Sequence, residues 1–238
     1  MVANITYVAV QTYNPYTGMP MTAVVGKDRL DAYFNPKAAE LALEDYKAGD
    51  KLVPFKVIAE YKGTDLIGME YEQLIPWVKP VEVSEDGSWK VSDKGFRVIP
   101  GDYVTTEDGT GIVHIAPTFG ADDANVARAA GIPSLFMISK KGETRPMVDL
   151  TGKFYVLDEL DENFVKERVN VDLYKEYAGR FVKNAYDPNL TDQDESLDVS
   201  LCMMMKANNQ AFKIEKHVHN YPHCWRTDKP VLYYPLDS

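Results

Sequence analysis

Short apolar runs separated by turn-forming residues are the feature that most constrains the fold of this chain. The 238 residues include 15 glycines and 14 prolines, and only three or four stretches with helical spacing interrupt the apolar runs. A regular parallel sheet would require strict alternation of strands and helices, which the sequence does not show. The pattern therefore predicts an α+β fold with a β-rich core.

Local patterns locate the individual elements. β-branched and aromatic residues predict strands at residues 5–11, 21–25, 56–61, 112–116, 135–139, 212–218 and 231–234, with further short strands and turns between 66 and 102. A turn at 14–18 makes the first two strands a hairpin. Helical spacing or favourable helix ends predict helices at 36–47, 121–130 and 196–208. For 161–177, one helix and two helices with a bend are both compatible with the apolar spacing.

The charge of the chain excludes attraction of nucleic acid by bulk electrostatics. Thirty-six acidic residues against 26 basic residues give a formal net charge of −10. Phosphate binding depends on clustered lysine and arginine, so any contact with RNA must be local. The acid-rich stretches at 158–162 and 187–198 are expected to be solvated helix faces and loop tips.

The sequence also argues against a membrane or secreted protein. No apolar run approaches the ~18 residues that a membrane helix needs, and the amino end lacks the pattern of a signal peptide. The two cysteines, Cys202 and Cys224, are too few for a disulfide framework or a four-cysteine zinc site. We therefore expect a cytoplasmic protein with no membrane partner.

Residues 108–123 hold the densest group of side chains that can carry chemistry. Gly109 and Gly111 flank Thr110, His114 follows on an expected strand, and paired carboxylates open an expected helix. Glycines let the backbone approach a ligand closely, so this segment is a candidate pocket rim. The alternative is a tight turn followed by a histidine packed in the core. Neither the spacing of a phosphate loop nor its lysine is present.

Two strings within the sequence resemble a known family. GTGIVHIAPTFGADD resembles the signature of the editing domain of isoleucyl-tRNA synthetases, and HNYPHCWRTDKPVLYYPLDS is similar to the segment that returns to their synthetic core. Valyl and leucyl enzymes share the GTG turn and the final aspartate, whereas His114 together with YPHCWR favours the isoleucyl family. The resemblance implies one editing domain over 1–238, excised from a longer synthetase, with 209–238 as the junction. It also implies that domain's fold, a β-barrel-like mixed core with peripheral helices.

The function that the resemblance implies is hydrolysis of valine wrongly esterified to tRNA(Ile). A difference of one methylene supports only about 10–200-fold discrimination, a limit for which isoleucyl-tRNA synthetases are themselves the standard example. A second, hydrolytic sieve remedies this. The alternative is a noncatalytic tRNA-positioning or structural insertion domain of the same enzyme.

The resemblance also assigns site residues. Asp123 is expected to pair with the α-ammonium group of the substrate, and Asp122 to be a solvent-exposed residue of the helix start. His114 is expected on the pocket wall near the terminal ribose, and whether it also acts as a general base stays open. The catalytic candidates are therefore Asp123 and His114, and the substrate-binding candidates are Gly109, Thr110, Gly111, Phe119 and Gly120.

No metal or cofactor is expected for the editing reaction, whereas ATP and magnesium would serve the separate synthetic site of the parent enzyme. The expected partners are the acceptor end of tRNA(Ile) carrying valine and the remainder of the synthetase, in a monomer. His217, His219 and His223 with Cys224 suggest zinc as an alternative, but the resemblance makes this segment a structural junction. A threonine-rich strand of the family is expected just upstream of Asn4 and is absent, so the activity of this chain alone stays open.

Overall fold

The computed structural model describes residues 4–216 and 220–235, which form two compact units. Unit 1 comprises Met1–Tyr71, Arg97–His114 and Leu201–His217. Unit 2 comprises Glu72–Phe96, Ile115–Ser200 and Val218–Ser238. Each unit is therefore assembled from three separate segments of chain. The expectations of a single editing domain over 1–238 and of a junction at 209–238 stay predictions.

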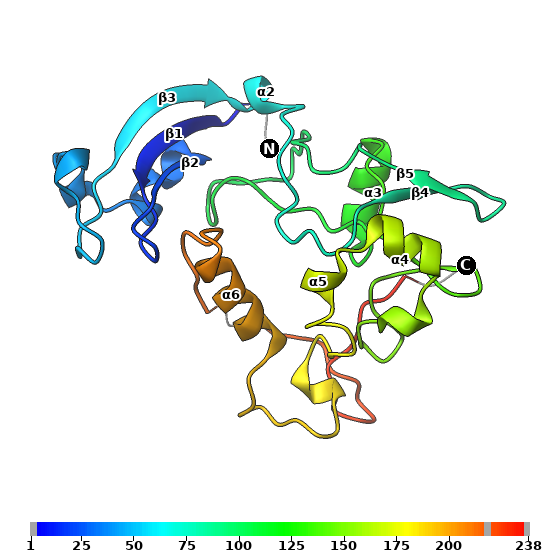
Figure 1. Cartoon of the computed structure of the whole chain (residues 1–238). Coiled ribbons are helices and arrows are strands. Elements are labelled where there is room, and N and C mark those ends of the chain that lie inside the picture. The colour runs from blue at the N-terminus through cyan, green and yellow to red at the C-terminus, as the bar shows by residue number, and fades with distance from the viewer. Residues whose placement is uncertain (1–3, 217–219, 236–238) are drawn as a thin grey trace. The chain divides into compact units, whose positions relative to one another are not determined.

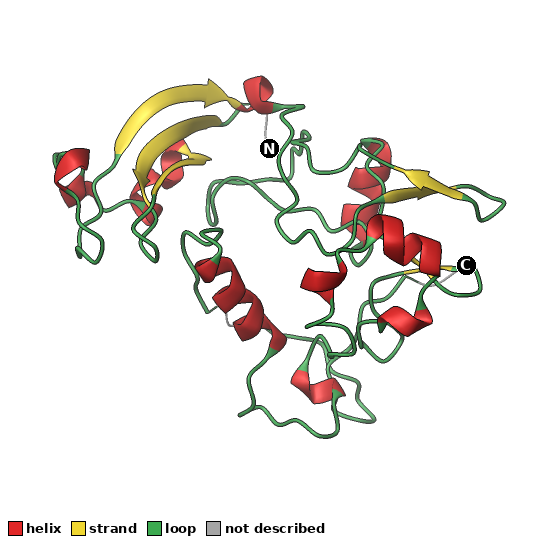
Figure 2. Ribbon diagram, viewed as in Figure 1, coloured by secondary structure: helices red, strands yellow, loops and turns green. Residues whose placement is uncertain are grey.

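Unit 1 contains a three-stranded antiparallel sheet (Figures 1 and 2). Its central strand is β1 (Thr6–Tyr13), which pairs with β2 (Pro20–Gly26) on one side and with β3 (Lys56–Lys62) on the other. The register shifts at a bulge between Ala9 and Val10 on the side of β3. The predicted hairpin and the predicted strand at 56–61 are confirmed.

The core of unit 1 joins residues that are distant in sequence. Phe34 packs against Phe55 and Phe212, with ring centroids 5.2 Å and 5.4 Å away, respectively. Next to this cluster, the side-chain amide of Asn14 donates to the carbonyl of Ala211 at 2.8 Å. The segment at 211–212 thus completes a core that begins with the first strand. The buried members of the cluster are Val8, Val10, Val25, Phe34, Ala38 and Phe55.

Short helical turns connect β2 to β3: η1 (Lys27–Arg29), α1 (Leu30–Tyr33), η2 (Pro36–Ala38) and η3 (Leu43–Asp45). A further short helix, α2 (Gly63–Leu66), follows β3. The helix predicted at 36–47 is therefore wrong, because only two separate 3-10 turns form there. Ala38 is buried whereas Leu41 is exposed, so this segment has no continuous apolar face to stabilise so short a helix. The helix predicted at 196–208 is confirmed as α6 (Leu197–Ala207).

Unit 2 has two small antiparallel sheets and several helices. The strands are β4 (Val81–Val83) with β5 (Trp89–Val91), and β6 (Met137–Ile138) with β7 (Thr144–Arg145). The helices are α3 (Ala121–Ala129), α4 (Glu162–Arg168) and α5 (Val171–Tyr174), with 3-10 turns η4 (Leu157–Glu159) and η5 (Asn184–Tyr186). An aromatic cluster fills its core, with the Trp77 ring 4.3 Å from that of Tyr177 and 5.7 Å from that of Phe154.

Both segments of unit 2 that were predicted to be helical form helices. The helix at 121–130 is confirmed as α3, and 161–177 forms two helices, α4 and α5. The division follows from capping, because the side chain of Asn170 accepts a hydrogen bond from the backbone of Leu173 and starts a second helix. The strand expected at 135–139 is present in shortened form as β6.

Three other strand predictions are wrong for the residues that the structure describes. Residues 112–116 form no strand, and Ile112 and Val113 are exposed. Residues 212–216 and 231–234 are not strands either. Their backbone groups bond elsewhere: Ile214 N–H donates to the hydroxyl of Tyr16, and Val231 N–H donates to the carbonyl of Pro222. Alternating polarity alone therefore did not create a ladder.

The predicted α+β class is confirmed, but the barrel is not seen. In the described part of the chain, the sheets have three, two and two strands, and none of them closes on itself. Over the same residues, no helix is both long enough and apolar enough to cross a membrane.

Candidate functional site

The glycine-threonine-glycine turn of unit 1 depends on backbone conformations that favour glycine. Gly109 has φ of 58° and Gly111 has φ of 76°, both in the left-handed region. Between them, the Thr110 hydroxyl lies 3.2 Å from the carbonyl of Ile112 and 3.3 Å from its N–H. The sequence therefore folds here into a compact loop that leads to His114.

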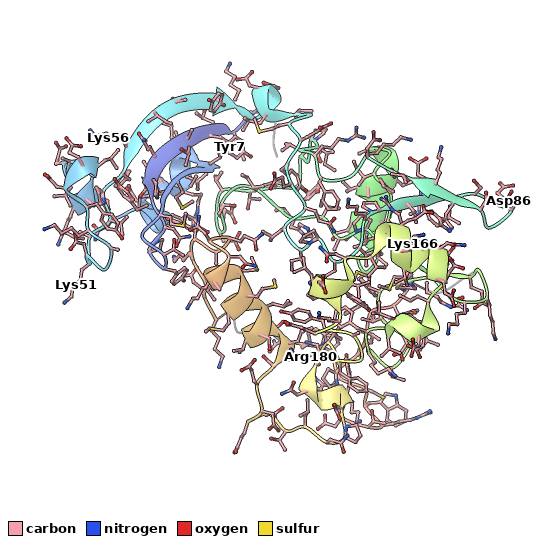
Figure 3. All side chains as sticks on the ribbon, viewed as in Figure 1. Tyr7, Lys51, Lys56, Asp86, Lys166 and Arg180 are labelled. Atoms are coloured by element: carbon pink, nitrogen blue, oxygen red, sulfur yellow. The ribbon has the colours of Figure 1, made fainter. Side chains whose placement is uncertain are left out.

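Hydrogen bonds from the amino-terminal part of unit 1 hold this loop. The hydroxyl of Tyr7, which lies on β1 (Figure 3), donates to the carbonyl of Gly111 at 2.7 Å. The N–H of Gly26 donates to the carbonyl of Thr110 at 2.8 Å. Arg29 binds the loop as well, at residues 107 and 109. We call residues 107–111 the clamped loop, because these hydrogen bonds hold it in place.

Arg29 contributes two of the bonds to the clamped loop. Its Nε donates to the carbonyl of Gly109 at 2.9 Å, and its Nη1 donates to the carbonyl of Glu107 at 3.0 Å. Sequence reasoning missed Tyr7, Gly26 and Arg29. No local signal marks them, since each meets the loop across a long stretch of intervening chain.

Thr110 also lines a cavity within unit 1. The cavity has a volume of about 380 Å³ and a largely apolar lining. Its wall is formed by Ala23, Val24, Val25, Tyr33, Phe34, Thr110, Cys202, Met205 and residues 210–215. The clamped loop thus closes one side of a hollow bounded by β2 and by the segment after α6.

His114 is the last residue of the second segment of unit 1, three positions beyond Gly111, and it is exposed. The alternative in which this histidine is packed in the core is therefore wrong. An exposed imidazole at this position is accessible to a ligand, as a role beside a ribose would require.

Asp123 lies in the first turn of α3, in unit 2, and is half-buried. Its Oδ2 accepts a hydrogen bond from the N–H of Ala116 at 2.9 Å, which closes the loop before the helix. A Cβ at Gly120 would lie 3.1 Å from this carboxyl group, so glycine leaves room for it. A carboxylate has acceptor sites on both oxygens, so Asp123 can bind a cation while it holds the loop. Asp122 is exposed, as expected.

Phe119 contacts Tyr234, near the carboxyl end of the described residues. Its ring lies edge-on to the ring of Tyr234 with centroids 6.3 Å apart, and the Tyr234 hydroxyl donates to the carbonyl of Val148 at 3.0 Å. Burial and the neighbouring Tyr155 raise the pKa of Tyr234 to about 12, so its hydroxyl remains a donor at neutral pH. Nearby in the sequence, Thr118 is buried and donates to the carbonyl of Leu135, a contact that sequence reasoning also missed.

The candidate residues belong to different units. Gly109, Thr110, Gly111 and His114 lie in unit 1, whereas Phe119, Gly120 and Asp123 lie in unit 2. The placement of His114 and Asp123 on one cleft therefore stays a prediction.

The zinc alternative gains no support from the described residues. Across 4–216 and 220–235, no group of three or more His, Cys, Asp or Glu side chains is arranged to hold a metal ion. His217 and His219 lie outside the described residues. Cys224 sits in a tight turn, where hydrogen bonding with the side chain of Thr227 lowers the pKa of its thiol.

Comparison with known proteins identifies the family. No family model matches the chain. It is 81% identical over 244 residues to an isoleucine-tRNA ligase of Bacteroides thetaiotaomicron, covering 98% of this chain and 21% of that protein. It is 57% identical over 235 residues to the ligase of Porphyromonas gingivalis, with 98% and 20% covered. It is 38% identical over 184 residues to that of Clostridium acetobutylicum, with 77% and 13% covered.

These relatives are aminoacyl-tRNA synthetases. The chain belongs to the isoleucine-tRNA ligase family and spans about one fifth of the length of the curated relatives that match it over most of its residues.

Proposed function

We propose that this chain carries the editing site of an isoleucine-tRNA ligase, which hydrolyses valine esterified to tRNA(Ile). The observation that carries the proposal is the environment of Asp123. A half-buried carboxylate in the first turn of α3, already oriented by the N–H of Ala116, is suited to bind an α-ammonium group.

In the proposed reaction, water attacks the carbonyl carbon of the valyl ester. The bond between this carbon and the ribose oxygen breaks, free valine leaves, and a proton from the water ends on the ribose oxygen. Asp123 holds the ammonium group of valine, and His114 contacts the terminal ribose. Hydrolysis of an ester is intrinsically easier than that of an amide, so positioning of substrate and water supplies much of the catalysis.

The glycines of the site allow close approach of the substrate. Gly109, Thr110 and Gly111 present backbone to the substrate in unit 1, and Phe119 and Gly120 do so before α3 in unit 2. The clamped loop supports this proposal, because a preformed binding element costs less ordering on binding.

The partners follow from the same proposal. The substrate is the acceptor end of valyl-tRNA(Ile), and the remainder of the ligase, a cytoplasmic monomer in this proposal, holds the body of the tRNA. Hydrolysis itself is assigned no metal or cofactor. We assign ATP and magnesium to the separate synthetic site of the intact ligase, as the resemblance of this chain to the isoleucyl family implies.

Replacement of Asp123 in the intact ligase tests the proposal. Asp123→Asn keeps an oxygen that can accept from Ala116 but removes the negative charge, so it separates loop closure from ammonium binding. We expect hydrolysis of valyl-tRNA(Ile) to fall by at least about tenfold, because a charge-assisted bond is lost. Aminoacylation with isoleucine should stay near the wild-type rate.

Asp122→Asn is the matched control, since this neighbouring carboxylate is exposed in the same turn. It should hydrolyse valyl-tRNA(Ile) normally. Wild-type hydrolysis by Asp123→Asn would overturn the assignment and would favour the alternative of a noncatalytic tRNA-positioning or structural insertion.

A further inference from the structure

The clamped loop is held by groups that have no part in the proposed chemistry. Carbonyl oxygens of residues 107, 109, 110 and 111 each accept a hydrogen bond, and every donor belongs to Tyr7, Gly26 or Arg29. Four carbonyls that are fixed in this way, three of them consecutive, leave the loop little freedom to rotate its peptide planes.

Tyr7 donates to the clamped loop from the buried interior of unit 1. Its side chain is fully buried, and it stands on β1, which is paired on both sides. The acceptor is the carbonyl of Gly111, a buried residue. Removal of the hydroxyl would leave this carbonyl without that partner away from water, which favours rearrangement of the loop.

Gly26 makes the close approach possible. A Cβ on Gly26 would lie 3.3 Å from the carbonyl oxygen of Thr110, tighter than ordinary contact. Its φ of −55° suits any residue, so an alanine there would press on the loop without straining its own backbone.

We propose that Tyr7 is a positioning residue for editing: its hydroxyl fixes the Gly111 peptide and, through it, the segment that carries His114. This inference rests on the proposed function. Tyr7 itself touches no substrate. Its effect reaches the reaction through Gly111 and residues 112–114, all within unit 1.

Tyr7→Phe in the intact ligase tests the inference, with Tyr13→Phe as a matched control. Tyr13 lies on the same strand and its hydroxyl also donates to a backbone carbonyl, that of Leu43 at 2.8 Å, away from the clamped loop. We expect Tyr7→Phe to lower kcat for valyl-tRNA(Ile) hydrolysis by about three- to tenfold, the range of one lost hydrogen bond, with little change in KM. Tyr13→Phe should leave kcat unchanged.

Hydrogen exchange supplies a measurement that does not depend on activity. The amides of residues 26 and 112, which donate to the carbonyl and to the hydroxyl of Thr110, should exchange faster in Tyr7→Phe and in Gly26→Ala, but not in Tyr13→Phe. Gly26→Ala should also lower kcat for hydrolysis of valyl-tRNA(Ile). Faster exchange with unchanged kcat would overturn the positioning role, and unchanged exchange would overturn the clamp itself.

The same experiments separate this inference from the proposed function. If Asp123→Asn hydrolyses valyl-tRNA(Ile) normally, the proposed function fails whatever Tyr7→Phe does. If Asp123→Asn loses hydrolysis and Tyr7→Phe keeps it, the function stands and the role of Tyr7 falls. A thermal midpoint for Tyr7→Phe close to that of Tyr13→Phe would show that a lower kcat is not general unfolding.

Discussion

Glu82 shows how ion pairs and hydrogen bonds can strongly perturb a single half-buried side chain. On β4, it lies opposite Lys90 of β5, whose Nζ is 3.1 Å from its carboxylate, and Lys94 Nζ is 2.9 Å away. The hydroxyl of Ser92 donates to the same group. These contacts belong to a hairpin whose turn carries Asp86 at its tip (Figure 3).

Hydrogen bonds with Lys94, the larger effect, and with Lys90 lower the pKa of Glu82 to about 2. A carboxylate with a depressed pKa stabilises the folded state above its ordinary pKa of 4.5, and this contribution is lost as the pH falls toward 2. Titration of the Glu82 carboxyl carbon by NMR measures the shift.

Lys94→Gln should move the pKa of Glu82 upward, toward its ordinary value. High salt should do the same in the wild-type chain, because exposed ion pairs are screened. An ordinary pKa for Glu82 at low salt would contradict the ion-pair geometry.

At the scale of elements, α4 depends on its amino-terminal cap. The carboxylate of Asp161 accepts from the N–H of Phe164 at 2.8 Å, and Phe164 is fully buried. We predict that Asp161→Ala lowers the free energy of unfolding by about 1 kcal/mol. Urea unfolding followed by circular dichroism measures this change.

The exposed Asp158 provides the control for this cap. Asp158→Ala should change the free energy of unfolding by less than about 0.5 kcal/mol, as is usual for surface substitutions. Equal losses in both variants would show that negative charge near α4, rather than the cap at Asp161, is what stabilises the helix.

Elements with strong local signals could be predicted from the sequence. The hairpin of β1 and β2 was marked by its turn, and α3 by its acidic first turn and by the glycine that follows it. The helix prediction at 36–47 is wrong because helix-forming residues in so short a segment do not make a helix without an aligned buried face. The strand predicted at 112–116 does not form, because strand propensity alone does not determine whether a partner strand is within reach.

The candidate site was predictable to the same extent. The glycines at 109 and 111 permit the positive φ that the loop adopts, and the placement of Asp123 follows from the helix start. The bond from Tyr7 to Gly111 joins residues 104 positions apart, which no local pattern encodes. Long-range contacts of this kind arise only once the chain has folded.

At the scale of the whole molecule, charge governs the encounter with tRNA. With a net charge of −10, the isolated chain should bind tRNA(Ile) weakly and with a shallow dependence on salt, because few cations can neutralise phosphates together. In the intact ligase, the other domains would supply a high effective concentration of the acceptor end. Titration of the chain with labelled tRNA(Ile) at low salt measures this, and submicromolar affinity would contradict the prediction.

The six segments of the two units alternate along the chain, so unit 1 is completed late during synthesis on the ribosome. Phe212 packs on the core of unit 1, so this core stays incomplete after residue 71 has been made and until residue 212 has been added. At about 5–20 residues per second, that wait lasts roughly 7–30 s. Throughout it, the apolar face of the first hairpin must be shielded by the nascent chain itself or by a chaperone, and a ribosome stalled inside unit 2 would leave it open to aggregation.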